Sequence, residues 1–235
     1  MGGQACVLYG ASEFTRNIDL ALILDNANQQ LFNKFLLELK AKIIAIPNFD
    51  IKFLEKGHAL HFRSEHDETK GLRIDIMSKM RGVDSFDILW SRRLTIELLD
   101  GVLVNLISLP DLVLAKKTQR DKDWPMIRRL LEADYFSQST QNQSPDKVNI
   151  EKVKFWFKEI RTPSILIKLC EVHPILAKEF SSNREVINTS IKKDVRGIEL
   201  GLTQEEELER KLDREYWAPL KAELEKLRHL KQVIK

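Results

Sequence analysis

The chain has 235 residues, of which 43% are hydrophobic and 31% charged, a balance typical of a globular protein with one large or two small domains. No apolar run approaches the roughly 18 residues that cross a membrane, and the N-terminus has no signal-peptide pattern, so we expect a cytoplasmic protein without membrane contact. The net charge of +3 excludes a polybasic nucleic-acid coat. The two cysteines, Cys6 and Cys170, fit reduced thiols better than a disulfide or a zinc site.

The clearest break in the chain is the polar stretch 137–147, SQSTQNQSPDK, which contains no large apolar residue and one proline. Such a stretch cannot join a core, and it predicts a linker. Strand and helix patterns alternate before it, whereas only helical patterns follow it. We therefore predict an α/β domain over residues 1–136 and a helical domain over residues 148–235.

Within the first domain, the two-residue periodicity of strands and the roughly 3.6-residue periodicity of helices alternate along the chain. Alternating apolar residues, or short apolar runs, predict strands at 18–24, 51–54, 58–63 and 72–77. Helical spacing predicts helices at 31–44, 85–93 and 110–122, with a new start or a kink at Pro125. The pair Asp100-Gly101, between apolar runs at 95–99 and 102–107, predicts a tight hairpin.

The second domain shows three helical segments. Helices are predicted over 150–160 and 162–176, with Thr162-Pro163 as the N-cap and first helical residue of the latter. A last helix is expected to begin at Thr203, where Thr-Gln-Glu-Glu forms a capping box. Pro219 is expected to bend or split this helix, because proline lacks an N–H and clashes in a helix interior.

Two aspartates interrupt apolar strand patterns. Asp19 follows Asn17 by two residues, so both side chains point to one face of the predicted strand. Asp75 lies between apolar neighbours of a later strand. Carboxylates on adjacent strands repel each other unless a cation lies between them, and Mg²⁺ prefers such oxygen ligands. The alternative is that Asp19 and Asp75 are strand-end residues that face solvent.

Basic and histidine side chains offer further candidates. The segment from Lys116 to Arg129 holds six basic and two acidic residues, the most basic stretch of the chain. It could contact a nucleotide or an RNA backbone, and the alternative is a solvated surface. His58 and His61 would face opposite sides of a strand, which argues against a shared metal site.

The order of these features resembles the nucleotidyltransferase superfamily with a polymerase-β-like palm. The opening GGQACVLYGASEFTRNIDLAL is most similar to the AbiEii-type, toxin-like nucleotidyltransferases, and VNLISLPDLVLAKKTQRDKDW at 104–124 resembles the segment after the third carboxylate of that group. The resemblance covers about residues 2–135. It implies an α/β fold with a nucleotidyltransferase-like mixed sheet flanked by helices. Because family members carry a helix and a strand before the glycine pair, the sheet is expected to expose an edge.

The resemblance also assigns a metal and phosphate site. Gly2 and Gly3 match a turn that brings the backbone close to the nucleotide phosphates, a role suited to a residue without a Cβ. Asp19 matches the second carboxylate of a D-x-D pair and Asp75 the third, and together they would hold Mg²⁺ or Mn²⁺. Asn17 stands where the family has its first aspartate, and an amide oxygen can bind Mg²⁺ but brings no charge.

The implied site is completed by three residues from a later segment of the chain, between Lys116 and Asp123. Lys116 matches a lysine that contacts phosphate. On a continuous helix, Arg120 and Asp123 would share its face, with Arg120 as a second phosphate ligand and Asp123 as a further catalytic residue. The alternative for Asp123 is to cap the helix that starts near Pro125.

The implied reaction is attack by an acceptor hydroxyl on the α-phosphate of a nucleoside triphosphate, with release of pyrophosphate. The implied acceptor is an RNA, such as tRNA, or a protein, and an antitoxin-like protein is an implied partner. Asn17 leaves two functions open. The chain is either a magnesium-dependent nucleotidyltransferase or a binding module that has lost the charge needed for catalysis.

Overall fold

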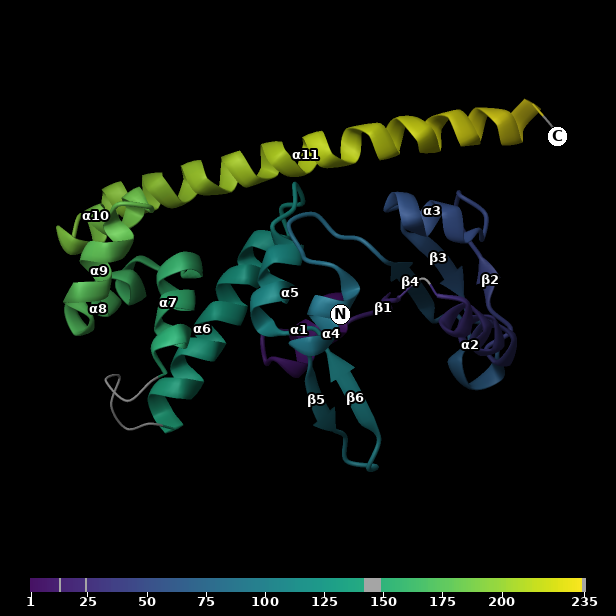
Figure 1. Ribbon diagram of the computed structural model, residues 1–235, viewed down its shortest axis with the longest axis horizontal. Coiled ribbons are helices and arrows are strands. Elements are labelled where there is room, and N and C mark those ends of the chain that lie inside the picture. The colour runs from purple at the N-terminus through teal and green to yellow at the C-terminus, as the bar shows by residue number, and fades with distance from the viewer. Residues whose placement is uncertain (13, 24, 142–148, 234–235) are drawn as a thin grey trace. The chain divides into compact units, whose positions relative to one another are not determined.

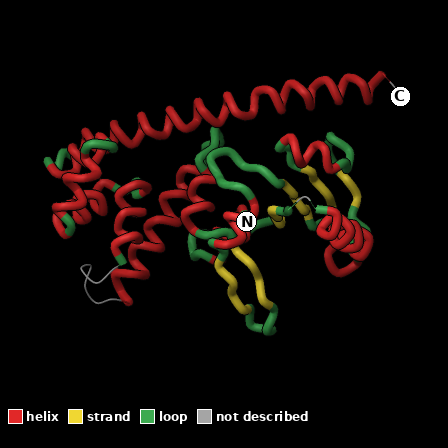
Figure 2. Tube along the Cα trace, viewed as in Figure 1, coloured by secondary structure: helices red, strands yellow, loops and turns green. Residues whose placement is uncertain are grey.

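The computed structural model describes residues 1–12, 14–23, 25–141 and 149–233. The protein is a mixed α/β structure with a small mixed sheet and a helical C-terminal region (Figures 1 and 2). The chain divides into two compact units. The sheet unit comprises Met1–Leu8, Ser12–Ala115 and Asp213–Lys235, and the helical unit comprises Tyr9–Ala11 and Lys116–Leu212. In the described part of the chain, no helix is both long and apolar enough to cross a membrane.

The main sheet of the sheet unit has the strand order β1-β4-β3-β2. Its strands are β1 (Asn17–Ala21), β2 (Lys42–Ile43), β3 (Leu60–Arg63) and β4 (Arg73–Met77). β1 and β4 are parallel, whereas the β4–β3 and β3–β2 pairs are antiparallel. β1 and β2 are therefore the edge strands. The strands predicted at 18–24, 58–63 and 72–77 are confirmed: β1 starts one residue earlier and ends at Ala21, β3 and β4 start later than predicted, and residue 24 lies outside the described residues.

One face of this sheet is apolar and the other is polar, because side chains alternate along each strand. The apolar face packs against α2 (Asn26–Glu38) and α3 (Ile51–Lys56). Its core consists of seven buried side chains: Phe32, Phe53, Leu54, Leu60, Phe62, Ile74 and Ile76. The polar face carries the functional candidates of β1 and β4.

Two predictions for the segment between β1 and β3 are wrong in element type or length. Residues 51–54 form the start of α3 rather than a strand, because the Asp50 side chain caps the helix by accepting from the Lys52 N–H (3.0 Å) and Gly57 ends it with φ of 102°. The helix predicted over 31–44 starts earlier, at Asn26 behind the cap Asp25. It ends at Glu38, and β2 follows.

The remaining elements of the sheet unit lie at its N-terminus and after β4. α1 (Gly2–Leu8) opens the chain, so the predicted glycine turn is the start of a helix. α4 (Phe86–Ser91) confirms the short helix predicted at 85–93. β5 (Leu94–Glu97) and β6 (Leu103–Leu106) form the hairpin predicted around Asp100-Gly101 (Figure 1). α5 (Leu109–Lys116) ends six residues earlier than the predicted helix over 110–122.

The helical unit contains α6 (Asp123–Gln141), α7 (Ile150–Glu159), α8 (Pro163–Val172), α9 (Pro174–Ser181), α10 (Glu185–Ile191) and the first part of α11 (Val195–Val233). The helix predicted over 162–176 is two helices, because Pro174 cannot continue α8. α6 extends to Gln141, so the first residues of the predicted linker are helical, while 142–148 lie outside the described residues.

α11 starts earlier than predicted, and it is not split at Pro219. Thr203 lies in the helix interior and its hydroxyl donates to the Glu199 carbonyl (2.9 Å), so the capping box is not used. The N-terminal cap is supplied by Asp194, whose side chain accepts from the Gly197 N–H (3.0 Å). Pro219 lies within one continuous helix. The last part of α11 belongs to the sheet unit, where Glu223 bonds to the buried His58 (2.9 Å).

Candidate active site

The two strand aspartates are neighbours on the polar face of the sheet. Asp19 on β1 lies directly opposite Asp75 on β4, and Asn17 lies two residues earlier on the same face. The side-chain amide of Asn17 donates from Nδ2 to Oδ1 of Asp19 (3.1 Å) and to Oδ2 of Asp75 (3.0 Å). The neutral amide therefore bridges the two carboxylates with its N–H groups, as the strand patterns alone could not show.

Asp75 is also held by two side chains of β3 and β4 on the same face of the sheet. Its Oδ1 accepts from Nε of Arg73 (2.7 Å) and lies 2.7 Å from Nδ1 of His61, which is opposite it on β3. Burial raises the pKa of this carboxyl, but hydrogen bonds from His61 and Arg73 outweigh burial, so the pKa lies below its usual value. Asp75 is therefore an anion at neutral pH, although the residue is only 7% exposed.

The glycine pair allows the backbone of α1 to approach this site. The Gly3 N–H donates to Oδ2 of Asp19 (3.2 Å). Gly2 has φ of 64°, and a Cβ at this position would lie 2.1 Å from the same oxygen. A Cβ on Gly3 would lie 2.4 Å from Oγ1 of Thr15. Both glycines are thus required for close packing around Asp19, and contact with a phosphate remains a prediction.

The oxygen atoms around Asn17 suit a hard divalent cation. Oδ1 and Oδ2 of Asp19 and Oδ2 of Asp75 accept from the N–H groups of Asn17 and Gly3, which a cation can displace or share. Rotation of the Asn17 amide would add its Oδ1, which now accepts from Thr15 (3.2 Å). Across the described ranges, no group of three or more His, Cys, Asp or Glu side chains is arranged to hold a metal. The donor set is therefore two carboxylates and one amide, which fits Mg²⁺ or Mn²⁺ with few protein charges.

In the helical unit, the other predicted site residues surround Asp123. Nζ of Lys116 lies 3.3 Å from Oδ1 of Asp123, and Oδ2 accepts from Thr118 (2.6 Å) and Arg120 (2.7 Å). Because α5 ends at Lys116, Arg120 lies in a loop, and the predicted helical face shared by Lys116, Arg120 and Asp123 is wrong. The side chains meet through a turn that leads into α6.

This cluster is a largely buried ion pair. The side chain of Lys116 is 12% exposed and that of Asp123 is 3% exposed, so the alternative of a solvated surface is wrong for Lys116. Burial raises the pKa of Asp123, but the charge of Lys116, the hydrogen bond from Thr118 and the charge of Arg120 outweigh burial and lower it. The ion pair fixes the start of α6, and roles in phosphate binding or catalysis remain predictions.

Lys116→Met is expected to reduce the free energy of unfolding by about 1–3 kcal/mol, because Asp123 loses one cation but keeps Arg120 and Thr118. Urea denaturation measures this change. The folded pKa of Asp123 is lowered, so its stabilisation is present above the unfolded pKa of about 3.9 and is lost as the pH falls through the folded value. The loss in free energy of unfolding caused by Lys116→Met should therefore become smaller at acidic pH. The exposed Lys122 is the matched control, and equal effects of Lys116→Met and Lys122→Met would contradict a buried pair.

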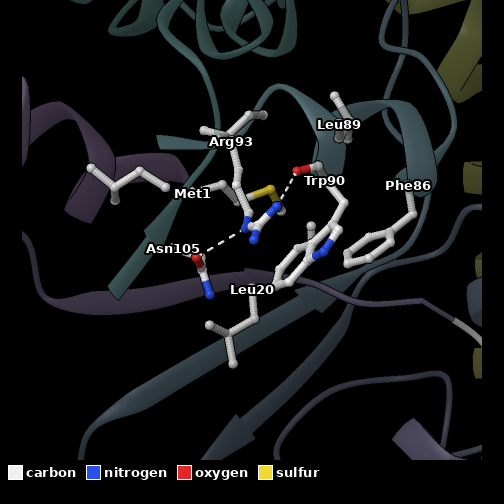
Figure 3. A pocket seen from close by; sticks show the side chains of 10 residues that line it. Met1, Leu20, Phe86, Leu89, Trp90, Arg93 and Asn105 are labelled. Atoms are coloured by element: carbon white, nitrogen blue, oxygen red, sulfur yellow. Dashed lines mark hydrogen bonds between the residues drawn. The ribbon is translucent and has the colours of Figure 1, made fainter. Parts of the chain in front are cut away.

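A pocket of about 110 Å³ opens at the carboxyl end of β1 (Figure 3). Leu20 and Ala21 of β1 contribute to it together with residues of α4 and β6. Phe86 and Trp90 stack with ring centroids 5.7 Å apart, and the guanidinium of Arg93 lies 4.0 Å from the Trp90 ring centroid. The pocket is thus mainly apolar and has an arginine at one wall.

Sequence reasoning missed His61 and Arg73 as partners of Asp75, and it missed this pocket. Arg73 precedes Asp75 by two residues, so strand periodicity could have placed both on one face. No signal in the sequence gives the register of β3 against β4, which brings His61 opposite Asp75. The pocket joins segments far apart in the chain, and its residues follow no local pattern.

A search of protein-family models finds no match to this chain, and no curated protein matches it. The nucleotidyltransferase resemblance therefore depends on the residues quoted for it in the sequence.

Proposed function

We propose that the chain is a magnesium-dependent nucleotidyltransferase with a nucleotidyltransferase-like sheet, which moves a nucleotide from a nucleoside triphosphate to an RNA or protein acceptor. One observation carries the proposal: Asp19 and Asp75 face each other on adjacent parallel strands and share one donor, Asn17. Two such carboxylates on a partly open sheet face are suited to a divalent cation and a phosphate. A toxin-like role with an antitoxin-like partner belongs to the same proposal.

In this reaction the acceptor hydroxyl oxygen attacks the α-phosphorus, the bond to the β-phosphate breaks, pyrophosphate leaves, and the hydroxyl proton passes to water. A bound Mg²⁺ would neutralise charge on the phosphates and orient the attacking oxygen. The chain supplies the anionic side chains of Asp19 and Asp75 to hold that ion. His61 and Arg73 keep Asp75 ionised and fix its orientation, and the Gly3 N–H fixes the orientation of the Asp19 carboxylate.

A second function is favoured by a specific contact. The Asn17 amide already satisfies both carboxylates without any cation. A protein with this arrangement can be stable as a module that binds a nucleotide, a nucleic acid or a partner protein and performs no transfer. The two functions differ in whether bound nucleotide is consumed.

The experiment is incorporation of labelled nucleotide into bulk RNA and into the protein itself, with each of the four triphosphates and Mg²⁺. Wild type is expected to transfer label, and Asp19→Ala is expected to abolish transfer, because one of the two carboxylates is lost. Asp67→Ala, an exposed aspartate in the short helical turn Asp67–Thr69 between β3 and β4, is the control and should retain full activity. Transfer that survives Asp19→Ala would refute this active site. Binding of triphosphate without transfer would instead identify the binding module.

A further inference from the structure

We propose that the pocket at the carboxyl end of β1 binds the base of the nucleotide, and that it prefers a base with a ring carbonyl (guanine, cytosine or uracil) over adenine. This inference rests on the proposed function, because that function brings a nucleoside triphosphate to Asp19 and Asp75. It adds the residues that recognise the base, foremost Asn105 and Arg93.

The position of the pocket relative to the carboxylates fits one nucleotide. Ala21 lines the pocket and lies two residues, about 6–7 Å, beyond Asp19 on the same face of β1. A ribose can bridge such a gap between a phosphate held at the carboxylates and a base. The pocket therefore begins where the carboxylate site ends.

Size and wall chemistry select a flat ring. Sites that enclose a whole drug-sized ligand have volumes of roughly 300–1,000 Å³, so a pocket of about 110 Å³ suits only one part of a nucleotide. One wall is the stack of Phe86, Trp90 and the Arg93 guanidinium, and the buried side chains of Leu89 and Leu106 provide apolar contacts. Proteins commonly hold nucleobases against aromatic rings and arginine planes.

The polar groups of the pocket offer hydrogen-bond donors. Oδ1 of Asn105 accepts from Nε of Arg93 (3.1 Å) and from Oγ1 of Thr95 (2.8 Å). This use of the oxygen fixes the amide orientation, and Figure 3 shows the amide nitrogen of Asn105 turned from Arg93 toward Leu20. In the part of the chain that the structure describes, neither this Nδ2 nor Nη2 of Arg93 has a hydrogen-bond partner.

Free donors match bases that present carbonyl oxygens. Arginine donates to O6 and N7 of guanine, and an amide nitrogen can donate to a ring carbonyl of guanine, cytosine or uracil. Adenine has no ring carbonyl: its N7 accepts a hydrogen bond, but the neighbouring exocyclic amine donates, so a pair of donors that fits O6 and N7 of guanine would face that amine. An unpaired polar group in a binding site costs affinity, so adenine should bind more weakly.

The test is isothermal titration of GTP, CTP, UTP and ATP with Mg²⁺, and of the four nucleoside monophosphates in EDTA. In wild type, at least one carbonyl-bearing base should bind about tenfold or more tightly than adenine, since one good base contact contributes about 1–3 kcal/mol. Asn105→Asp exchanges the donor for an acceptor and should erase or reverse this preference. Asn105→Ala should weaken it, and the exposed Asn48→Asp should leave it unchanged.

The outcomes separate this inference from the proposed function. Triphosphate binding that needs Asp75 but shows no base preference, or a preference unchanged in Asn105→Asp, would overturn the base pocket and leave the transferase standing. Monophosphates that bind in EDTA with a preference dependent on Asn105, without transfer of any triphosphate, would support the pocket and remove the transferase. Absence of binding by every nucleotide would overturn both.

Discussion

Asp75→Ala is expected to abolish Mg²⁺ binding and to lower the rate of nucleotide transfer on the order of a thousandfold. Loss of a residue that only hydrogen-bonds to a metal ligand already lowers metal affinity or activity about 10–100-fold, and loss of a ligand itself should lower them further. Asp75 is one of the two carboxylates that the Asn17 amide bridges, and His61 and Arg73 keep it ionised. Titration calorimetry with Mg²⁺ and labelled-nucleotide incorporation measure the two losses. In wild type, Mg²⁺ at a hundredfold excess over its Kd should stabilise the fold by about 2.7 kcal/mol, and in the variant by nothing.

This variant should still fold, so its loss of function can be interpreted. Arg73 and His61 lose a shared acceptor, but their side chains are 47% and 26% exposed and can be hydrated, so we expect a cost of about 1–2 kcal/mol. Because the pKa of Asp75 is lowered in the folded state, its stabilisation is present above the unfolded pKa of about 3.9 and is lost as the pH falls through the folded value. The stability deficit should therefore narrow in acid.

The control for this prediction is Asp87→Ala, which removes an exposed aspartate of α4 and should leave Mg²⁺ binding unchanged. Retention of Mg²⁺ binding by Asp75→Ala would show that the ion lies elsewhere, and the proposed use of Asp19 and Asp75 would fail with it.

The carboxylate pair could be anticipated from the sequence because it depends on the simplest periodicity. In NIDLA and RIDIM, one aspartate lies among alternating apolar residues, so each points to the face opposite the core once the strand forms. Periodicity does not give the pairing or the register of those two strands, and a shift of the register by one residue would separate the two carboxylates. The resemblance implied a shared metal site for Asp19 and Asp75, whereas the register that places them opposite each other is a finding of the structure.

Where the sequence predicted the wrong type or length of an element, side chains outside the periodic pattern determine that type or length. Residues 51–54 have an apolar content that suits a strand or a helix, and the caps Asp50 and Gly57 select the helix. The helical pattern over 110–122 is interrupted after Lys116, where Thr118 and Arg120 turn back to bond with Asp123. Such contacts join side chains in a loop, and no periodicity reports them.

Asn17→Asp distinguishes the enzyme from the binding module, and its first effect is on stability. Without metal it replaces the donor that bridges Asp19 and Asp75 with a third carboxyl, so two hydrogen bonds are lost and like charges are crowded together. We expect a loss of about 2–4 kcal/mol in the free energy of unfolding. Asn17→Ala is the control, because it removes the same donor without adding charge, and its loss should be smaller.

With Mg²⁺ present, the order of stability should reverse, and Asn17→Asp should become more stable than wild type. The added charge raises affinity for the cation, so the melting temperature of Asn17→Asp should rise more steeply with Mg²⁺ concentration than that of wild type. An enzyme limited by the missing charge should transfer nucleotide faster in this variant, whereas a binding module should transfer none in either form. A variant that gains no Mg²⁺ affinity would contradict a cation position between Asn17, Asp19 and Asp75. Faster transfer in Asn17→Asp would mean that the Asn17 amide limits a working active site, because its N–H groups occupy the carboxylate oxygens that the cation requires.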